Sequence, residues 1–109
     1  MKKDNKIDRI FKALADPTRR EILYLLVAAA AAMNINEVSD RFPATRQGVT
    51  KHLKVLEEAG LIQAETLGRE RHLRLEPAGL EPARSYLDAI GQGWETALQS
   101  LKAHVEGKG

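Results

Sequence analysis

Polar side chains of the types that bind double-stranded DNA gather in segment 45–54. At about 100° per residue of a helix they share one face, with the first of them at its edge: Arg46, Gln47, Thr50, Lys51 and Lys54. Glutamine can form paired hydrogen bonds with adenine, arginine with guanine, and lysine or threonine with phosphates. No acidic side chain interrupts the segment. A helix that enters the major groove needs groups of this kind.

The opposite face of the same segment is apolar. Val49, Leu53 and Leu56 fall on one narrow stripe, which predicts that this side packs on a core. Taken alone, the pattern also suits an ordinary amphipathic helix whose solvated face binds nothing. The neighbouring segments decide between these two interpretations.

A short helix is expected upstream, over residues 36–42. Asn36 is a suitable cap, because its side-chain oxygen can accept a backbone N–H of the first turn. Val38 and Phe42 would pack this helix on the core. The Pro-Ala pair that follows makes a tight connection to the next segment.

A second helix is expected directly after this connection. Thr45 can cap its start, and Gly60 can end it because glycine adopts the left-handed conformation without steric cost. Two helices joined by so short a turn form a helix-turn-helix, here over residues 36–59.

A β-hairpin is expected next, over residues 61–75. Segments 61–67 and 71–75 would be its strands, with Leu73 and Leu75 on one face of the second. The turn between them would be Gly68-Arg69-Glu70.

The charge at the tip of this hairpin suits a wing that lies beside DNA. Arg69 and Arg71 flank the turn and have the sign that phosphates require. The expected fold class is therefore mainly α with a small β-hairpin (α+β), arranged as a winged helix-turn-helix.

Three ordered motifs link the chain to a known family. They are segment 50–62 (TKHLKVLEEAGLI), segment 14–23 (LADPTRREIL), and Gly68-Arg69-Glu70-Arg71 followed by Leu73-Arg74-Leu75. On these motifs the chain resembles the ArsR/SmtB family of bacterial transcriptional repressors, from about residue 8 to residue 105. The resemblance implies a homodimeric winged-helix repressor that leaves its operator when a signal arrives.

The chain departs from this family in two places. Leu73 stands where the family often has an aromatic residue, which changes the packing under the wing. The run Ala28–Ala32 replaces a short polar or glycine-containing connection. It can lengthen the preceding helix or form a loop, and the sequence leaves both open.

The predicted DNA-binding residues divide by chemistry. Arg46, Gln47 and Thr50 are expected to contact base edges. The phosphate contacts are assigned to Thr45, Lys51, Lys54, Arg69 and Arg71. Two further arginines, Arg19 and Arg20, are left out, because a structural ion pair with Glu21 or Asp16 explains them equally well.

Length and composition predict one small domain over residues 1–109. The chain has no cysteine, which excludes disulfides and thiolate metal sites. No apolar run is long enough to span a membrane, and the amphipathic N-terminal segment does not resemble a signal peptide. We therefore expect a cytoplasmic protein with no membrane partner.

The distribution of charge says more than the net charge of +2. Residues 1–20 carry seven basic and three acidic side chains, and residues 44–75 carry six and four. Residues 76–106 carry two basic and five acidic side chains. The basic excess thus lies where a DNA-facing surface is expected.

The two ends of the chain, residues 1–15 and 79–106, predict dimerisation helices. Each has an apolar stripe at helical spacing, and the second stripe runs from Leu80 to Val105. Such a long stripe exceeds what one small core can cover, so a second copy would bury it. The alternative is that both helices cover only their own domain. The predicted interface residues are Ile7, Ile10, Phe11, Leu87, Ile90, Trp94, Leu98 and Leu101.

Gly91 and Gly93 each weaken the second terminal helix by about 1 kcal/mol. They would permit a bend or a close backbone approach there.

No metal or cofactor is expected. His52, His72 and His104 are scattered, and Asp88 lies about 24 Å from His104 along one helix, so only a partner's helix could bring such ligands together. The resemblance is to the cysteine-free branch of the family with a tryptophan in the final helix. This branch implies a regulator with a non-metal signal, which the sequence does not identify.

Catalysis is not expected either, because phosphate-binding glycine loops and a nucleophile elbow are both absent. The rival to DNA binding is a winged helix that binds protein. That function would favour apolar or acidic outward positions in segment 45–54, where the chain has Gln47, Lys51 and Lys54.

Overall fold

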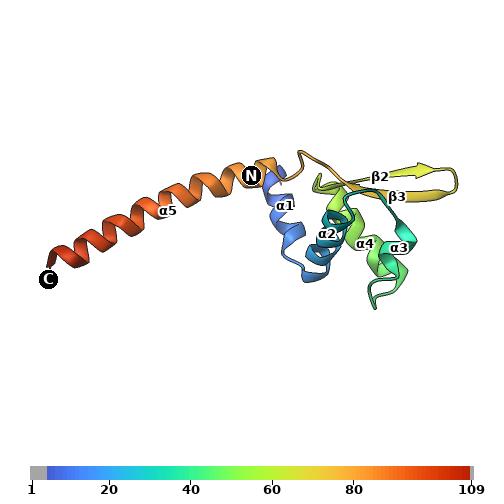
Figure 1. The fold of residues 1–109 in the computed structure, drawn as a ribbon, viewed down its shortest axis with the longest axis horizontal. Helices are drawn as coiled ribbons and strands as arrows, with labels where there is room; N and C mark the ends of the chain where they lie inside the picture. The colour runs from blue at the N-terminus through green and yellow to red at the C-terminus, as the bar shows by residue number, and fades with distance from the viewer. Residues whose placement is uncertain (1–4, 109) are drawn as a thin grey trace.

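Five helices and three short strands make up residues 5–108, the part of the chain that this computed structural model describes (Figure 1). Residues 1–4 of the predicted N-terminal helix lie outside it. In chain order the elements are α1 (Lys6–Leu14), α2 (Pro17–Ala29), β1 (Met33–Asn34), α3 (Ile35–Ser39), α4 (Arg46–Glu58), β2 (Ile62–Leu67), β3 (Glu70–Leu75) and α5 (Glu81–Lys108).

The first two helices begin at polar caps and meet at a tight corner. The Asn5 side chain accepts the N–H of Asp8, and the Asp16 side chain accepts the N–H of Arg19. Pro17 occupies the first turn of α2, where its missing N–H costs nothing.

The alanine run divides between a helix and a turn. α2 continues to Ala29, and Ala30 adopts the left-handed conformation with φ 54°. Its N–H then bonds to the carbonyls of Leu26 and Val27, so the last turn of α2 is closed before the chain reaches β1. Neither of the two expected outcomes describes the whole run.

The cap of α3 is Asn34 and not Asn36, which corrects the sequence-based assignment. The Asn34 side chain accepts the N–H of Asn36, and the Glu37 carboxylate accepts the N–H of Asn34 over 3.0 Å. This reciprocal pair is a capping box, and it starts the helix earlier than expected. The helix also ends earlier, at Ser39.

The wing is part of a three-stranded antiparallel sheet with strand order β1-β3-β2, where a two-stranded hairpin was expected. Leu73 of β3 pairs with Met33 on one side and with Ala64 on the other. Leu67 pairs with Glu70, so the turn is the two residues Gly68 and Arg69, and Glu70 belongs to the strand. Gly68 has φ 65°, which glycine adopts at little cost.

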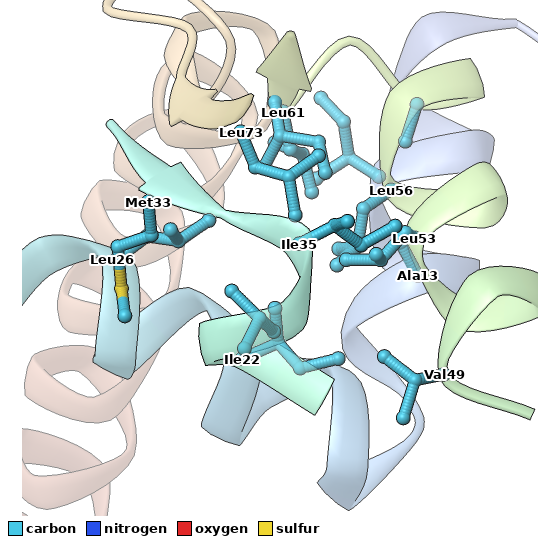
Figure 2. Packing of buried hydrophobic residues seen from close by; sticks show 14 of the residues in the cluster. Ala13, Ile22, Leu26, Met33, Ile35, Val49, Leu53, Leu56, Leu61 and Leu73 are labelled. Atoms are coloured by element: carbon cyan, nitrogen blue, oxygen red, sulfur yellow. The ribbon is translucent and has the colours of Figure 1, made fainter. Parts of the chain in front are cut away.

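The core lies where α1, α2, α3 and α4 meet the sheet (Figure 2). The stripe predicted on α4 is buried, and Leu73 fills the space under the wing with no exposed surface. A buried leucine or isoleucine contributes about 1.5–3 kcal/mol to folding, so these contacts dominate the positioning of α4. The side chains labelled in Figure 2 are Ala13, Ile22, Leu26, Met33, Ile35, Val49, Leu53, Leu56, Leu61 and Leu73.

Gly79 lets the chain pass close to the end of α4 before α5 begins. A Cβ at this position would lie 2.3 Å from the carbonyl oxygen of Gly60. No side chain fits there without a backbone shift. Gly60 itself has φ 77° and ends the turn after α4, as predicted.

The last helix, α5, leaves the body beside the start of α1 and projects away from it (Figure 1). Ala83 is buried, and Tyr86 packs edge-on against Phe11 with ring centroids 5.9 Å apart. Beyond these contacts the helix continues without interruption through Gly91 and Gly93 to Lys108. The projection makes the molecule 68 Å long and only 32 Å wide.

Candidate nucleic-acid interface

The helix α4 is held at its first turn by a cap and along its length by the core. The Thr45 hydroxyl oxygen accepts the N–H of Gly48 over 3.0 Å, which satisfies one free donor of the first turn. Val49, Leu53 and Leu56 are buried on the inner side. The polar face predicted from the sequence therefore has a fixed direction.

That polar face is fully open to solvent. All five of its side chains are exposed, and within residues 5–108 none of them forms an ion pair or a side-chain hydrogen bond: Arg46, Gln47, Thr50, Lys51 and Lys54. A side chain that forms no hydrogen bonds within its own protein has its donors and acceptors available for a ligand. The face can thus present an amide, a hydroxyl and three cationic groups at once.

The two wing arginines that were predicted to contact phosphates differ in their surroundings. Arg69 lies exposed in the turn between β2 and β3. Arg71 lies on β3 and forms an ion pair with Glu57, with its Nη2 atom 3.3 Å from Oε2 and 3.5 Å from Oε1. The sequence treated Arg71 as a free cation for phosphate, whereas the structure engages it with the end of α4.

A hollow of about 310 Å³ separates this part of the wing from α4. Its polar rim is formed by Thr50, Lys54, Glu57 and Arg71, and its floor is apolar. The helix side of the rim thus carries a hydroxyl, a cationic and an anionic group, and the sheet side carries a cationic group. The hydroxyl and the two cationic groups have the chemistry to contact a sugar-phosphate strand that passes between a helix and a wing.

Arg19 performs a structural task at the corner between α1 and α2. Its Nε atom donates to the carbonyl of Ala13 over 2.8 Å, and Nη2 donates to that of Lys12 over 3.1 Å. Nη1 lies 3.1 Å from Nδ1 of His52 on α4. A guanidinium can only donate, so Nδ1 of His52 is the acceptor in this contact.

Arg20 has a similar but smaller part, because its Nη1 atom donates to the carbonyl of Leu14 over 2.7 Å. Both arginines therefore bind the last carbonyls of α1, where a cation also opposes the negative end of the helix dipole. This explains them without DNA. Their side chains bond to carbonyls, and that of Arg19 also to His52, although the sequence suggested the carboxylates of Glu21 or Asp16.

Asp16 lies beside the same contact, and its pKa is lowered from the ordinary value of 3.8. The backbone N–H of Arg19 is the largest cause, since it bonds to the charged carboxylate. The nearby His52 and Arg19 side chains lower it further, and partial burial opposes them. His52 Nδ1 is 3.9 Å from the Asp16 carboxylate.

Sequence reasoning missed both the Arg19–His52 contact and the Glu57–Arg71 pair. For Arg19 a local signal was present, because two arginines follow closely on the end of a predicted helix, where cations bind free carbonyls. For Glu57 no local signal exists, because its partner is 14 residues away.

The predicted interface residues fall into three groups. Ile10 is only 1% exposed and belongs to the core of its own chain, so its side chain offers no surface to a partner, which corrects the prediction for this residue. Ile7 and Phe11 are half-buried. The α5 residues are exposed, from 47% for Ile90 to 67% for Trp94: Leu87, Ile90, Trp94, Leu98 and Leu101.

Within residues 5–108 no three histidine, aspartate or glutamate side chains come together as metal ligands. Among the same residues no helix has the length and apolar character needed to cross a membrane.

Comparison with known proteins gives a consistent result. Residues 14–63 match the family model described as a helix-turn-helix domain, HTH_20. The HTH-type transcriptional regulator Rv2034 of Mycobacterium tuberculosis is 35% identical over 102 residues, which cover 94% of this chain and 91% of that protein.

Two solved structures are similar in fold. An ArsR-like transcriptional regulator from Rhodococcus sp. RHA1 has a TM-score of 0.73 and 34% identity, with 89% of this chain and 90% of that chain covered. The homodimeric winged helix-turn-helix DNA-binding domain of Mb0332 from Mycobacterium bovis has a TM-score of 0.62 and 21% identity. It covers 80% of this chain and 79% of that one.

Proposed function

This chain belongs to the ArsR family of winged helix-turn-helix transcriptional regulators, and we propose that it represses transcription as a homodimer bound to an inverted-repeat operator. The observation that carries the proposal is the polar face of α4, whose side chains are exposed above a buried apolar stripe and form no ion pair or side-chain hydrogen bond within residues 5–108. We name α4 the recognition helix from here on. Each copy would place its recognition helix in a major groove.

We assign the contacts by the chemistry of each side chain. Arg46, Gln47 and Thr50, in the first turns of the recognition helix, would read base edges. The sequence-independent contacts to phosphates would come from Thr45, Lys51, Lys54, Arg69 and Arg71. Thr45 can serve both its helix and a phosphate, because its oxygen accepts the Gly48 N–H while its own proton remains to donate.

The second copy is proposed from the exposed stripe of α5. Trp94 and its apolar neighbours on this stripe are 47–67% exposed in the single chain. Each such side chain forfeits about 1.5–3 kcal/mol while it stays in water, so pairing with another α5 is strongly favourable. The similar Mb0332 domain is itself described as homodimeric. A two-fold dimer requires an operator with two-fold symmetry.

The mechanism of repression would be steric. A bound dimer covers its operator and blocks access to an overlapping promoter, without a separate activation surface. The inducing signal would lower the affinity for DNA, and the absence of cysteine fits the branch of the family that does not sense metals.

The proposal is tested by selecting binding sites from a pool of randomised duplexes of about 30 base pairs and titrating the enriched duplex at two salt concentrations. We expect an inverted repeat, and an affinity that falls roughly 10³-fold or more between about 50 and 200 mM salt, because each phosphate contact releases counterions. A protein that binds no duplex even at the lower salt concentration would instead be an interaction module for another protein.

A further inference from the structure

The ion pair between Glu57 and Arg71 joins the last turn of the recognition helix to the wing. The Arg71 guanidinium faces both carboxylate oxygens, at 3.3 and 3.5 Å. The Arg71 side chain is 51% exposed and the Glu57 side chain 30% exposed. The pair is therefore open to solvent and within reach of a bound strand.

Glu57 also lies in the path proposed for that strand. On the recognition helix it falls about 20° from Thr50 in projection and about 60° from Lys54. The same three residues and Arg71 form the polar rim of the hollow between helix and wing. The Glu57 carboxylate thus lies among side chains that are proposed to bind phosphates, such as Lys54 and Arg71.

The strength of the pair decides what it can do. Exposed ion pairs stabilise proteins weakly, because water screens them and both side chains lose freedom. β3 is already fixed by its pairing with β1 and β2 and by the burial of Leu73. The pair is too weak to add much to that support, but it is strong enough to occupy the Arg71 donors and offset its charge.

A carboxylate and a phosphate oppose an arginine in the same way, through paired oxygens that accept from the planar guanidinium. We propose that Glu57 competes with a DNA phosphate for Arg71 and so limits the sequence-independent affinity of the protein. Arg71 then binds a phosphate only by releasing Glu57. Arg69 has no ion pair within residues 5–108, so it can bind a phosphate without first breaking one. This inference rests on the DNA-binding function proposed above.

The test measures binding of a fluorescent duplex of scrambled sequence, about 30 base pairs long, at about 50 mM salt. Glu57→Gln removes the competitor, and Glu58→Gln is the matched control, because it removes the same charge from the next residue, which forms no ion pair within residues 5–108. We expect Glu57→Gln to tighten binding roughly two- to fivefold more than Glu58→Gln, the range for one exposed ion pair. The midpoint of thermal unfolding should hardly change.

The same pair of variants in an Arg71→Ala background shows whether the effect passes through Arg71. There the two glutamine variants should bind alike, and Arg71→Ala should cost more affinity in the Glu57→Gln protein than in the wild type. Weaker binding by Glu57→Gln would mean that the pair braces the wing and would overturn the inference. An advantage that persists without Arg71, or none over Glu58→Gln, would also overturn it.

These failures differ from a failure of the proposed function. If the wild type binds no duplex at this salt concentration, both the proposed DNA binding and the proposed competition are contradicted. If the wild type binds and the duplex affinities of the variants do not differ as described, only the role proposed for Glu57 is contradicted.

Discussion

The Arg19 guanidinium donates to Nδ1 of His52 over 3.1 Å, and this contact ties the corner between α1 and α2 to the flank of the recognition helix. The same guanidinium holds the last carbonyls of α1. Since α1 packs against α5, a single side chain links the region proposed for dimerisation to the helix proposed to read DNA.

Replacing Arg19 by alanine should therefore loosen two helices at once. We expect Arg19→Ala to lower the free energy of unfolding by about 1–3 kcal/mol, because three acceptors in a partly buried corner lose a charged donor. Chemical denaturation measures this change. Arg20→Ala is the control and should cost less, since Arg20 makes one such bond. Equal costs would show that the additional bonds of Arg19, including the one to His52, contribute nothing.

The charge of Asp16 should make stability depend on pH in the acid range. Its pKa is lowered in the folded protein, so its contribution is complete above the ordinary value of 3.8 and disappears as the pH falls through the lowered folded value. Asp16→Asn keeps a capping oxygen and removes the charge. The difference in melting temperature between wild type and variant should be largest near neutral pH and shrink on acidification. A difference that grows toward low pH would contradict the assignment.

Replacing Gln47 and replacing Lys51 should change DNA binding in different ways. Gln47→Ala should reduce binding to the selected operator by about 1–3 kcal/mol with little effect on scrambled DNA, since it removes a base contact. Lys51→Ala should weaken both duplexes alike, since it removes a phosphate contact. Parallel titrations of the two duplexes at one salt concentration separate these cases. Equal losses on both duplexes for Gln47→Ala would remove Gln47 from the base-reading group.

A charge placed on the apolar stripe of α5 should separate the proposed dimer. Leu98→Glu introduces a carboxylate on the stripe, and Gln99→Glu introduces the same group one residue later, well off it. Light scattering at micromolar concentration should give the mass of one chain for Leu98→Glu and of two for the wild type and Gln99→Glu. The dimer would have to use another surface if Leu98→Glu remained paired.

Gly79 should tolerate no side chain. In Gly79→Ala the new Cβ would meet the Gly60 carbonyl oxygen, and the backbone before α5 must shift, at a cost of about 1–3 kcal/mol. Gly93→Ala is the matched control, because its Cβ meets no atom within 4 Å and alanine favours the helix by about 1 kcal/mol. The midpoint of thermal unfolding should therefore fall for Gly79→Ala and rise for Gly93→Ala.

The parts of the fold that were predicted from sequence are those with local causes. The recognition helix begins at Thr45 because a threonine hydroxyl caps it, and it stops before Gly60 because glycine permits the left-handed turn. Both signals lie within a few residues of the boundary they determine. The exposed face of this helix follows equally from the spacing of its apolar residues.

The parts that were not predicted depend on distant neighbours. β1 has two residues and no pattern of its own, and it exists because Met33 and Asn34 pair with β3. The cap of α3 was wrong for a local reason: Asn36 was predicted, whereas Glu37, three residues after Asn34, completes a capping box with Asn34. In the site, Arg71 lies on the wing as expected, but it is not a free cation, because it forms an ion pair with Glu57 of α4.

The projecting α5 also has a consequence for gene dosage. A lone protomer leaves its apolar stripe in water and carries only half of the proposed reading apparatus. While lone protomers predominate, the amount of paired repressor grows with the square of the protomer concentration. Promoter occupancy would then rise more steeply with synthesis than for a repressor that binds as a single chain, so under the proposed pairing the length of one helix would contribute to the steepness of a genetic response.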